Sequence, residues 1–190
     1  MRIAGLVVAV LMALAPAVQA APYVMDKSHA HVTFAVSHLG FSMVHGQFRK
    51  FEANIDFDPG NVEATRVDFQ IEAASVETFW AARDKDLRSR NFLDVENHPY
   101  ITFKTTSVVP TGTDTADVNG DVTILGVTKP VTFQAKLNKL APSPFKKDTT
   151  IAGFTVTGKL DRTAFGMTYA APAIGALIDI RMDLEISPAK

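Results

Sequence analysis

Histidine is the residue type in this sequence best suited to metal or proton chemistry. The chain has five histidines and no cysteine. His29 and His31 lie two apart on one face of an extended segment, and His38 and His45 follow. Imidazole is the commonest metal-binding side chain, but there is no His-Glu-x-x-His motif or clustered third ligand, and a histidine on an apolar strand face, such as His38, is typical of a hydrogen-bonded core. A His-based metal-binding protein is therefore an alternative, and no metal site is predicted.

Nucleophilic or acid–base catalysis has weaker support. The serines are isolated, and none lies in a Gly-x-Ser-x-Gly elbow. Asp94 and Glu96 lie near His98, but they resemble helix and turn residues more than an acid–base pair. The charged residues around them could still serve catalysis in an open cavity. An enzyme acting on a lipid is thus a second alternative, whereas we expect a protein without catalysis or cofactor.

Arginine is the residue that would bind an anionic group. Its planar fork matches a phosphate or carboxylate. Four arginines are candidates for contacts with the head group of a ligand: Arg83, Arg88, Arg90 and Arg162. The other interpretation, left open at this point, is that they are solvated charges paired with neighbouring aspartates.

The composition excludes several classes of protein. Lys plus Arg is 19 and Asp plus Glu is 20, for a net charge of -1, so no nucleic-acid partner is expected. The absence of cysteine excludes disulfides, thiolate metal sites and a cysteine nucleophile. At 190 residues, of which 47% are hydrophobic, the chain has the length and composition of one globular domain.

Residues 1–20 have the pattern of a secretory signal peptide. Arg2 supplies the positive start, residues 3–15 are an unbroken apolar or glycine stretch, and Val18-Gln19-Ala20 is an acceptable cleavage site. The stretch is shorter than the roughly 20 apolar residues that span a bilayer. We therefore expect cleavage after Ala20, a periplasmic location, and a mature domain of residues 21–190.

Apolar and polar residues alternate through most of the mature chain, as in half-buried strands. In the clearest segment Ile178, Ile180 and Met182 alternate with charged residues. Eight such segments follow one another, at residues 32–38, 44–57, 67–73, 101–105, 118–124, 131–137, 154–160 and 178–186. In the second segment the apolar phase changes near Arg49 and Lys50, which predicts a β-bulge.

The stretch 76–99 breaks this alternation. Charges crowd residues 83–86, and the apolar residues around them have a nearly helical spacing. We predict one or two short helices here, ended by Pro99, as an insert between the third and fourth strands.

Eight strands of even spacing with short connections favour an antiparallel up-and-down barrel, which leaves no free sheet edge. Such a barrel either fills with side chains or holds one small ligand. The inward positions alternate between large and small residues: Phe34, Phe48, Phe69, Phe103, Phe133 and Phe154 against Gly46, Ala53, Ala73, Gly120, Ala135 and Gly158. The small residues indicate either a cavity or relief of a crowded core, and the sequence does not decide between them.

Residues 164–175 form an apolar loop that is unusual for a free surface. The loop must either plug the barrel or cover its entrance. Together with Phe79 and Trp80 it could form a lid. The sequence leaves the moving lid and the static plug as alternatives.

Four groups of residues resemble the YceI family of exported bacterial lipid-binding proteins. They are Asp26–His29 with His38–Gly40, Leu87–Ser89 with Phe92–Glu96 and Pro99–Phe103, Gly120–Val131, and Asp161–Met167. The resemblance covers essentially the whole mature chain, in order. It implies a lipocalin-like barrel that encloses a long isoprenoid or other amphipathic lipid, with no established enzymatic activity. The chain departs from the family pattern at Ala30, where serine is common, and at Asp86, where histidine is common, so head-group contacts at these positions are in doubt.

The residues and the resemblance together predict non-covalent binding of a long-chain isoprenoid or similar lipid, for carriage or sequestration. Transient membrane contact and a homodimer are compatible with the sequence. The residues predicted to line the lipid site are Val32, Phe34, Val36, His38, Val44, Phe48, Phe69, Ile71, Phe103, Val131, Phe133, Phe154, Val156, Phe165, Ile178, Ile180 and Met182.

Overall fold

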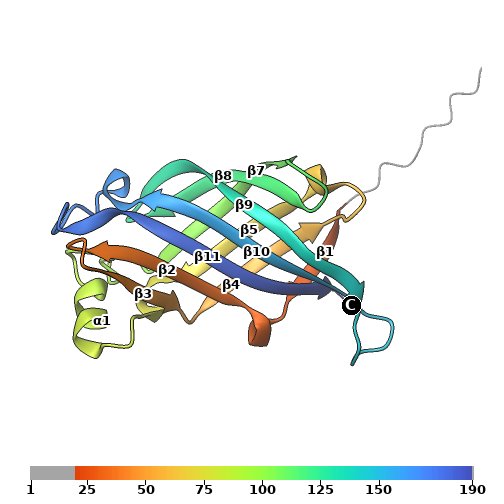
Figure 1. The fold of residues 1–190 in the computed structure, drawn as a ribbon, viewed down its shortest axis with the longest axis horizontal. Helices are drawn as coiled ribbons and strands as arrows, with labels where there is room; N and C mark the ends of the chain where they lie inside the picture. The colour runs from red at the N-terminus through yellow and green to blue at the C-terminus, as the bar shows by residue number, and fades with distance from the viewer. Residues whose placement is uncertain (1–19, 190) are drawn as a thin grey trace, which may run out of the picture.

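The computed structural model describes residues 20–189 as an elongated β-barrel (Figure 1). The C-terminus and β1 lie at one end of the barrel, and the single α-helix lies at the other. The predicted leader lies outside the described residues except for Ala20. Within the described part, no helix combines the length and hydropathy needed to cross a bilayer.

All neighbouring strands are antiparallel. In chain order they are β1 (Ala21–Met25), β2 (His31–His38), β3 (Ser42–Phe48), β4 (Phe51–Phe57), β5 (Arg66–Glu72), β6 (Val76–Glu77), β7 (Tyr100–Pro110), β8 (Thr115–Ile124), β9 (Val127–Pro142), β10 (Thr150–Asp161) and β11 (Ile174–Pro188). The sheet order is β1-β4-β5-β7-β8-β9-β10-β11-β2-β3-β6, with β1 also paired to β11.

The last strand closes the barrel. One edge of β11 pairs with β10, and its other edge pairs with β2 between Ile174 and Asp183 and with β1 between Ile186 and Pro188. β1 and β2 therefore act as one interrupted strand, as do β3 and β4. Counted in this way, the barrel has eight strands, which confirms the predicted architecture.

The apolar phase changes near Arg49 and Lys50 as predicted, but the predicted β-bulge is wrong, because the strand is interrupted there. These two residues lie outside strands and divide β3 from β4. The facing strand is interrupted too, by a 3₁₀ turn at Lys27–His29. Because both strands break at one level of the barrel, the change of phase occurs without an unpaired residue inside a continuous ladder.

The insert contains one α-helix, α1 (Ala81–Arg88), between β5 and β7. The helix ends well before Pro99, because hydrogen-bonded turns occupy residues 89–97. Pro99 instead directly precedes β7. β6 attaches the insert to the barrel by pairing Val76 with Phe48 of β3.

The two ends of the barrel differ, and we name them by what they carry. The insert end carries α1 and η4 (Arg162–Phe165). The turn end carries η2 (Val62–Ala64), the β7–β8 turn at 111–114 and the β9–β10 loop at 143–149. The remaining 3₁₀ segment, η3 (Ala73–Ser75), follows β5.

Candidate binding cavity

A cavity of about 270 Å³ lies inside the barrel. Its walls come from both the early and the late strands, and nearly all of its lining side chains are apolar. Nine of the residues predicted to line a lipid site border it: Val32, Phe69, Ile71, Phe103, Phe133, Phe154, Val156, Ile180 and Met182. The structure thus brings these nine side chains around one hollow. That they contact a lipid remains a prediction.

The cavity reaches the turn end. Val62 and Thr65 of the β4–β5 connection, residues 112–115 of the β7–β8 turn, and Leu140 of β9 also line it. Apart from Thr102, its polar residues belong to this region. We call this rim the mouth. The rim could not be predicted from the sequence, because the local pattern marks these residues only as turns.

Within residues 20–189, two buried side-chain oxygen atoms near the mouth have no hydrogen-bond partner. They are Oδ2 of Asp58 and Oγ1 of Thr65. The other carboxylate oxygen of Asp58 accepts the amide of Gly60 at 2.8 Å, which shapes the turn after β4. Buried polar atoms are nearly always paired, so these two oxygens are unusual, and Thr65 is the one whose residue lines the cavity.

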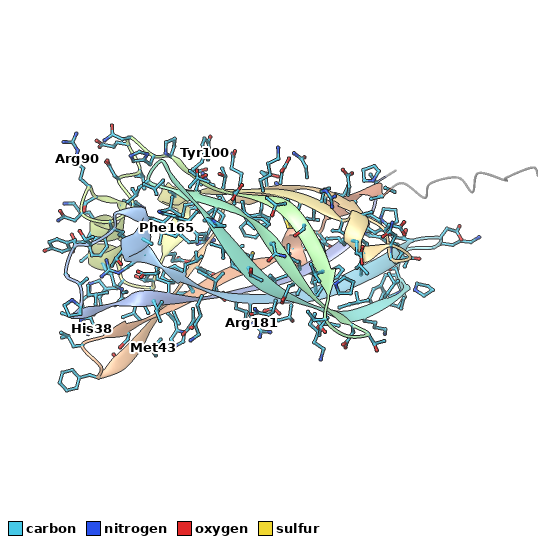
Figure 2. All side chains as sticks on the ribbon, turned by 90° about the horizontal axis from the view of Figure 1, so that it is seen from above. His38, Met43, Arg90, Tyr100, Phe165 and Arg181 are labelled. Carbon is cyan, nitrogen blue, oxygen red and sulfur yellow. The ribbon has the colours of Figure 1, made fainter. Side chains whose placement is uncertain are left out.

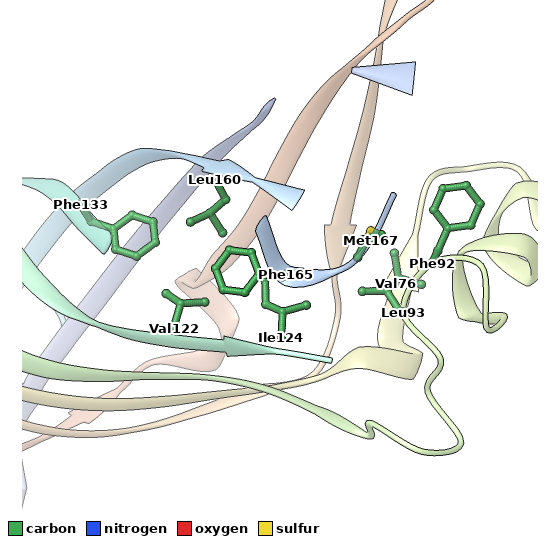
Figure 3. Close-up of a cluster of buried hydrophobic side chains, with 9 residues drawn as sticks. All are labelled: Val76, Phe92, Leu93, Val122, Ile124, Phe133, Leu160, Phe165 and Met167. Atoms are coloured by element: carbon green, nitrogen blue, oxygen red, sulfur yellow. The ribbon is translucent and has the colours of Figure 1, made fainter. Parts of the chain in front are cut away.

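Hydrophobic side chains fill the insert end. Phe165, with 2% of its surface exposed, and Met167 pack among residues of the barrel and of the insert. Figure 3 shows this cluster, whose buried members are Val76, Phe92, Leu93, Val122, Ile124, Phe133, Leu160, Phe165 and Met167. Phe165 and Met167 therefore plug the insert end, whereas residues 171–173 of the same loop are exposed.

Phenyl rings cover three of the small inward residues. Gly46 lies under the ring of Phe34, Gly120 under Phe103, and Gly158 under Phe133. A Cβ atom at Gly158 would lie 2.5 Å from the Phe133 ring, and at Gly120 it would also lie 2.5 Å from the carbonyl oxygen of Lys104. At these positions glycine makes room for an aromatic ring, so the idea that they contribute empty space is wrong.

The other eight predicted lining residues lie outside the cavity lining. They are Phe34, Val36, His38, Val44, Phe48, Val131, Phe165 and Ile178. Phe34, Phe48 and Val131 pack against the cluster of Figure 3, and Phe165 belongs to it. Val36 pairs with both Val44 and Ile178, close to the insert end. Phe34, Phe48 and Val131 are on the expected strands, but they lie where packed side chains fill the barrel.

His38 is an exposed residue, so placing it in the lining was wrong. It is the last residue of β2, where the strand enters the β2–β3 hairpin turn. Figure 2 shows it with Met43 at the tip of the insert end. The alternation of the sequence predicts which face of the sheet His38 is on, but His38 lies beyond the end of the barrel interior.

Arg162 has a structural role, because its guanidinium is surrounded by backbone. It is 2% exposed and donates to the carbonyl oxygens of Met167, Tyr169, Ile174 and Gly175, at 2.5–3.1 Å. Burial lowers the pKa of this guanidinium, and the charge of Asp161 opposes that change. Since its donors hold the plug loop in place, a head-group role for Arg162 is wrong.

The other three arginines are also at the insert end, away from the mouth. Arg83 donates to the hydroxyl and carbonyl oxygens of Thr78, and Arg88 to the carbonyl oxygens of Ala74 and Val76. Arg90 is exposed on the outer edge of the insert (Figure 2). None of the three lines the cavity, and the side chains of the filled insert end lie between them and it, so a head-group role for them stays a prediction.

One cluster within residues 20–189 has the donor types of a metal site. Potential ligand atoms of Asp26, His29 and Glu185 lie within 4.8 Å of one another. His29 Nδ1 is 3.1 Å from Asp26 Oδ2 and 3.9 Å from Glu185. Hydrogen bonds from Ser28 and the contact with His29 lower the pKa of Asp26 to about 2, and that contact raises the pKa of His29. His29 is exposed, and Asp26 and Glu185 are partly exposed. The hydrogen bonds from His29 and Ser28 to Asp26 fit a strand-connecting turn.

Comparison with known sequences identifies the family. The profile of the YceI-like domain matches residues 23–186. The chain belongs to the YceI-like family. A relative, the UPF0312 protein of Pseudomonas savastanoi, is 40% identical over 170 residues, which cover 88% of this chain and 85% of that protein.

Solved structures of YceI-like and related proteins have the same fold. A YceI protein of Campylobacter jejuni superposes with a TM-score of 0.75 at 28% identity, over 81% of this chain and 90% of that one. A polyisoprenoid binding domain from Saccharophagus degradans has a TM-score of 0.63 at 12% identity, over 88% and 98%. The second similarity concerns the fold alone.

The two departures from the YceI pattern do not lie at the mouth. Ala30 is buried in a second hydrophobic cluster, separate from that of Figure 3, which also contains Val32 and Ile186. Asp86 is exposed on α1 at the insert end. Neither substitution therefore changes the polar groups of the mouth.

Proposed function

We propose that this protein binds the apolar tail of a long-chain lipid, of isoprenoid type, non-covalently in the barrel cavity and carries or sequesters it without catalysis. The observation that carries the proposal is the apolar hollow whose polar lining is gathered at one open end. This arrangement suits an amphipathic molecule, which would place its tail inside and its polar group at the turn end.

The size of the cavity limits what it can hold. Ligand pockets commonly have volumes of about 300–1,000 Å³, so 270 Å³ is small. Each buried CH₂ contributes about 0.8 kcal/mol, and a section of tail therefore suffices for binding. We infer that a longer tail is only partly enclosed, and that tail length is distinguished weakly.

Two further observations support the class of ligand and the compartment. A protein of the same fold is described as a polyisoprenoid binding domain, which supports an isoprenoid tail. Residues 1–20 have the pattern of an export signal, which supports a periplasmic protein with a mature domain of residues 21–190.

The test is native mass spectrometry of the purified protein before and after organic extraction. We expect a lipid adduct that extraction removes, with the lipid recovered chemically unchanged. Ala135→Phe, which places a ring into the cavity, should abolish the adduct. Gln134→Phe adds the same ring to the exposed neighbouring position and should retain it.

Two outcomes would contradict the proposal. An undiminished adduct in folded Ala135→Phe would show that the lipid binds elsewhere. Conversion of an added lipid into a new product would favour an enzyme.

A further inference from the structure

We propose that the turn end docks on the surface of an anionic bilayer through the β9–β10 loop, so that the mouth opens against lipid. The inference rests on the proposed function, because it specifies where a bound tail would enter and leave. Its docking residues are Phe145, Lys146 and Lys147. In Figure 1 the loop projects beyond the barrel beside the C-terminus.

The loop presents an aromatic side chain to the outside. Phe145 is 94% exposed, the highest value among the exposed large hydrophobic residues. The Ser143 hydroxyl accepts the amides of Phe145 and Lys146, at 3.3 and 3.0 Å, and the Ser143 amide donates to the carbonyl of Thr149 at 2.7 Å. The loop is therefore shaped by its own hydrogen bonds while the phenyl ring remains in solvent. Aromatic rings at such positions partition into the interfacial region of a bilayer.

Positive charge accompanies the ring. Lys146 and Lys147 follow Phe145 directly, and Lys139 lies on the adjoining part of β9. None of the three makes a salt bridge within residues 20–189. Unpaired lysines beside an exposed aromatic ring match a surface of anionic lipid head groups.

The docking loop is continuous with the mouth. Leu140, at the end of β9, lines the cavity and is itself 39% exposed, and Val62 on the facing rim is 36% exposed. A tail that crossed water between the mouth and a bilayer would be disfavoured by about fourfold for every exposed CH₂. A mouth that faces the bilayer avoids that exposure.

The insert end also has exposed aromatic residues, which provide a control. Phe41, Phe79 and Trp80 are 90%, 77% and 64% exposed. Phe41 lies in the β2–β3 turn, and Phe79 and Trp80 lie between β6 and α1. A bilayer at that end would meet the plug of Phe165 and Met167 and not the cavity. Docking at the two ends can be distinguished by matched substitutions.

The first experiment measures co-sedimentation with vesicles of phosphatidylcholine alone and of phosphatidylcholine mixed with phosphatidylglycerol. Phe145→Ser should lower the partition coefficient on mixed vesicles roughly tenfold or more, and Phe41→Ser should leave it unchanged. Replacing Lys146 and Lys147 by Gln should lower binding to mixed vesicles roughly tenfold and leave binding to neutral vesicles unaffected. Equal binding of Phe145→Ser and the unmodified protein would overturn the proposal.

The second experiment uses the single tryptophan, Trp80, which lies at the opposite end from the loop. Its emission should not change when mixed vesicles are added. A tryptophan introduced by Phe145→Trp, combined with Trp80→Phe, should shift to the blue under the same conditions. A blue shift of Trp80 itself would show that the insert end docks, and would overturn the proposal.

A third measurement separates this proposal from the proposed function. A fluorescent long-chain alcohol should bind Phe145→Ser in solution as well as it binds the unmodified protein, because Phe145 does not line the cavity. Failure of the alcohol to bind either protein would contradict the proposed function. If both proteins bind the alcohol and also associate equally with vesicles, the docking proposal is contradicted and the proposed function is not.

Discussion

The closest packing at the scale of single residues is between phenyl rings and glycines on neighbouring strands. Phe103 lies over Gly120 and meets Phe133 edge to face, with ring centroids 5.5 Å apart. Phe133 in turn lies over Gly158. These contacts fix the rings against the barrel wall. They leave the cavity small, and both Phe103 and Phe133 belong to its lining.

Replacing Gly120 by Ala tests this packing. The new methyl group would overlap the Phe103 ring and lie 2.5 Å from the Lys104 carbonyl oxygen, so a shift of backbone or ring is required. We expect the free energy of unfolding to fall by about 1–3 kcal/mol, measured by denaturant titration. Gly153→Ala is the control, because a Cβ atom there meets nothing within 4 Å. Equal stability of the two variants would contradict this account.

A second residue-scale prediction concerns the Asp26–His29 contact. Asp26 raises the pKa of His29 above its value of 6.5 in the unfolded chain. The protonated His29 therefore adds to the free energy of unfolding in full below pH 6.5, and this contribution is lost as the pH rises through the folded-state pKa. The pKa of Asp26 is lowered from 3.8 to about 2. The ionised Asp26 therefore adds to the free energy of unfolding in full above pH 3.8, and this contribution is lost as the pH falls through about 2. The contact therefore stabilises the turn most between pH 3.8 and 6.5.

NMR titration of the His29 ring should give a pKa above 6.5, and Asp26→Asn should bring it back towards that value. An unmodified protein in which His29 titrates at or below 6.5 would show that the contact is not formed in solution.

At the scale of elements, the loop between β10 and β11 depends on one buried charge. Arg162 reaches four carbonyl oxygens with its fork, and they come from residues 167–175. With Arg162 in place, Phe165 and Met167 turn into the barrel and fill its insert end. Phe165 and Met167 are the buried hydrophobic residues of this loop, and Arg162 donates to carbonyl groups that the loop would otherwise leave without a protein partner.

Replacing Arg162 by Ala should lower the free energy of unfolding by about 3 kcal/mol or more, because several carbonyl oxygens lose their donors. Arg90→Ala removes the same side chain from an exposed position and should change stability by less than about 0.5 kcal/mol. Urea titration of both variants provides the measurement. Similar losses at the two positions would indicate that the hydrogen bonds of Arg162 contribute little.

The elements were largely predictable, because each depends on a local pattern. The alternation through Ile178, Ile180 and Met182 marks β11, and the loss of alternation after Val76 marks the insert. The role of Arg162 was not predictable in this way. Its partners lie in a loop without periodicity, and only the folded chain brings their carbonyl groups around it.

At the scale of the whole molecule, the barrel is asymmetric along its axis. At the insert end, side chains of the strands, the plug loop and the insert pack together and fill the barrel. Toward the turn end a second buried cluster, which includes Phe57, Phe69 and Ile186, borders the cavity instead of filling it. Period-two alternation distinguishes the inner from the outer face of a strand but contains no information on depth. For this reason Val156 and Val36 were predicted equally, although only Val156 borders the cavity.

Filling the cavity should stabilise the whole barrel. A ligand that binds only the folded state at 100 times its Kd adds about 2.7 kcal/mol, which for a domain of this size is a rise in Tm of roughly 5–10 °C. Protein stripped by organic extraction should therefore melt lower, and a long-chain alcohol should restore its Tm in scanning calorimetry. Ala135→Phe, whose ring occupies the hollow, should show no such response.

The plug at Phe165 has a kinetic consequence. The cavity is closed at that end, so a second ligand cannot enter while the first leaves by the other side. The bound ligand must leave through the mouth before another can enter. Exchange is then dissociative. Its rate is set by departure alone and stays constant however much competitor is supplied.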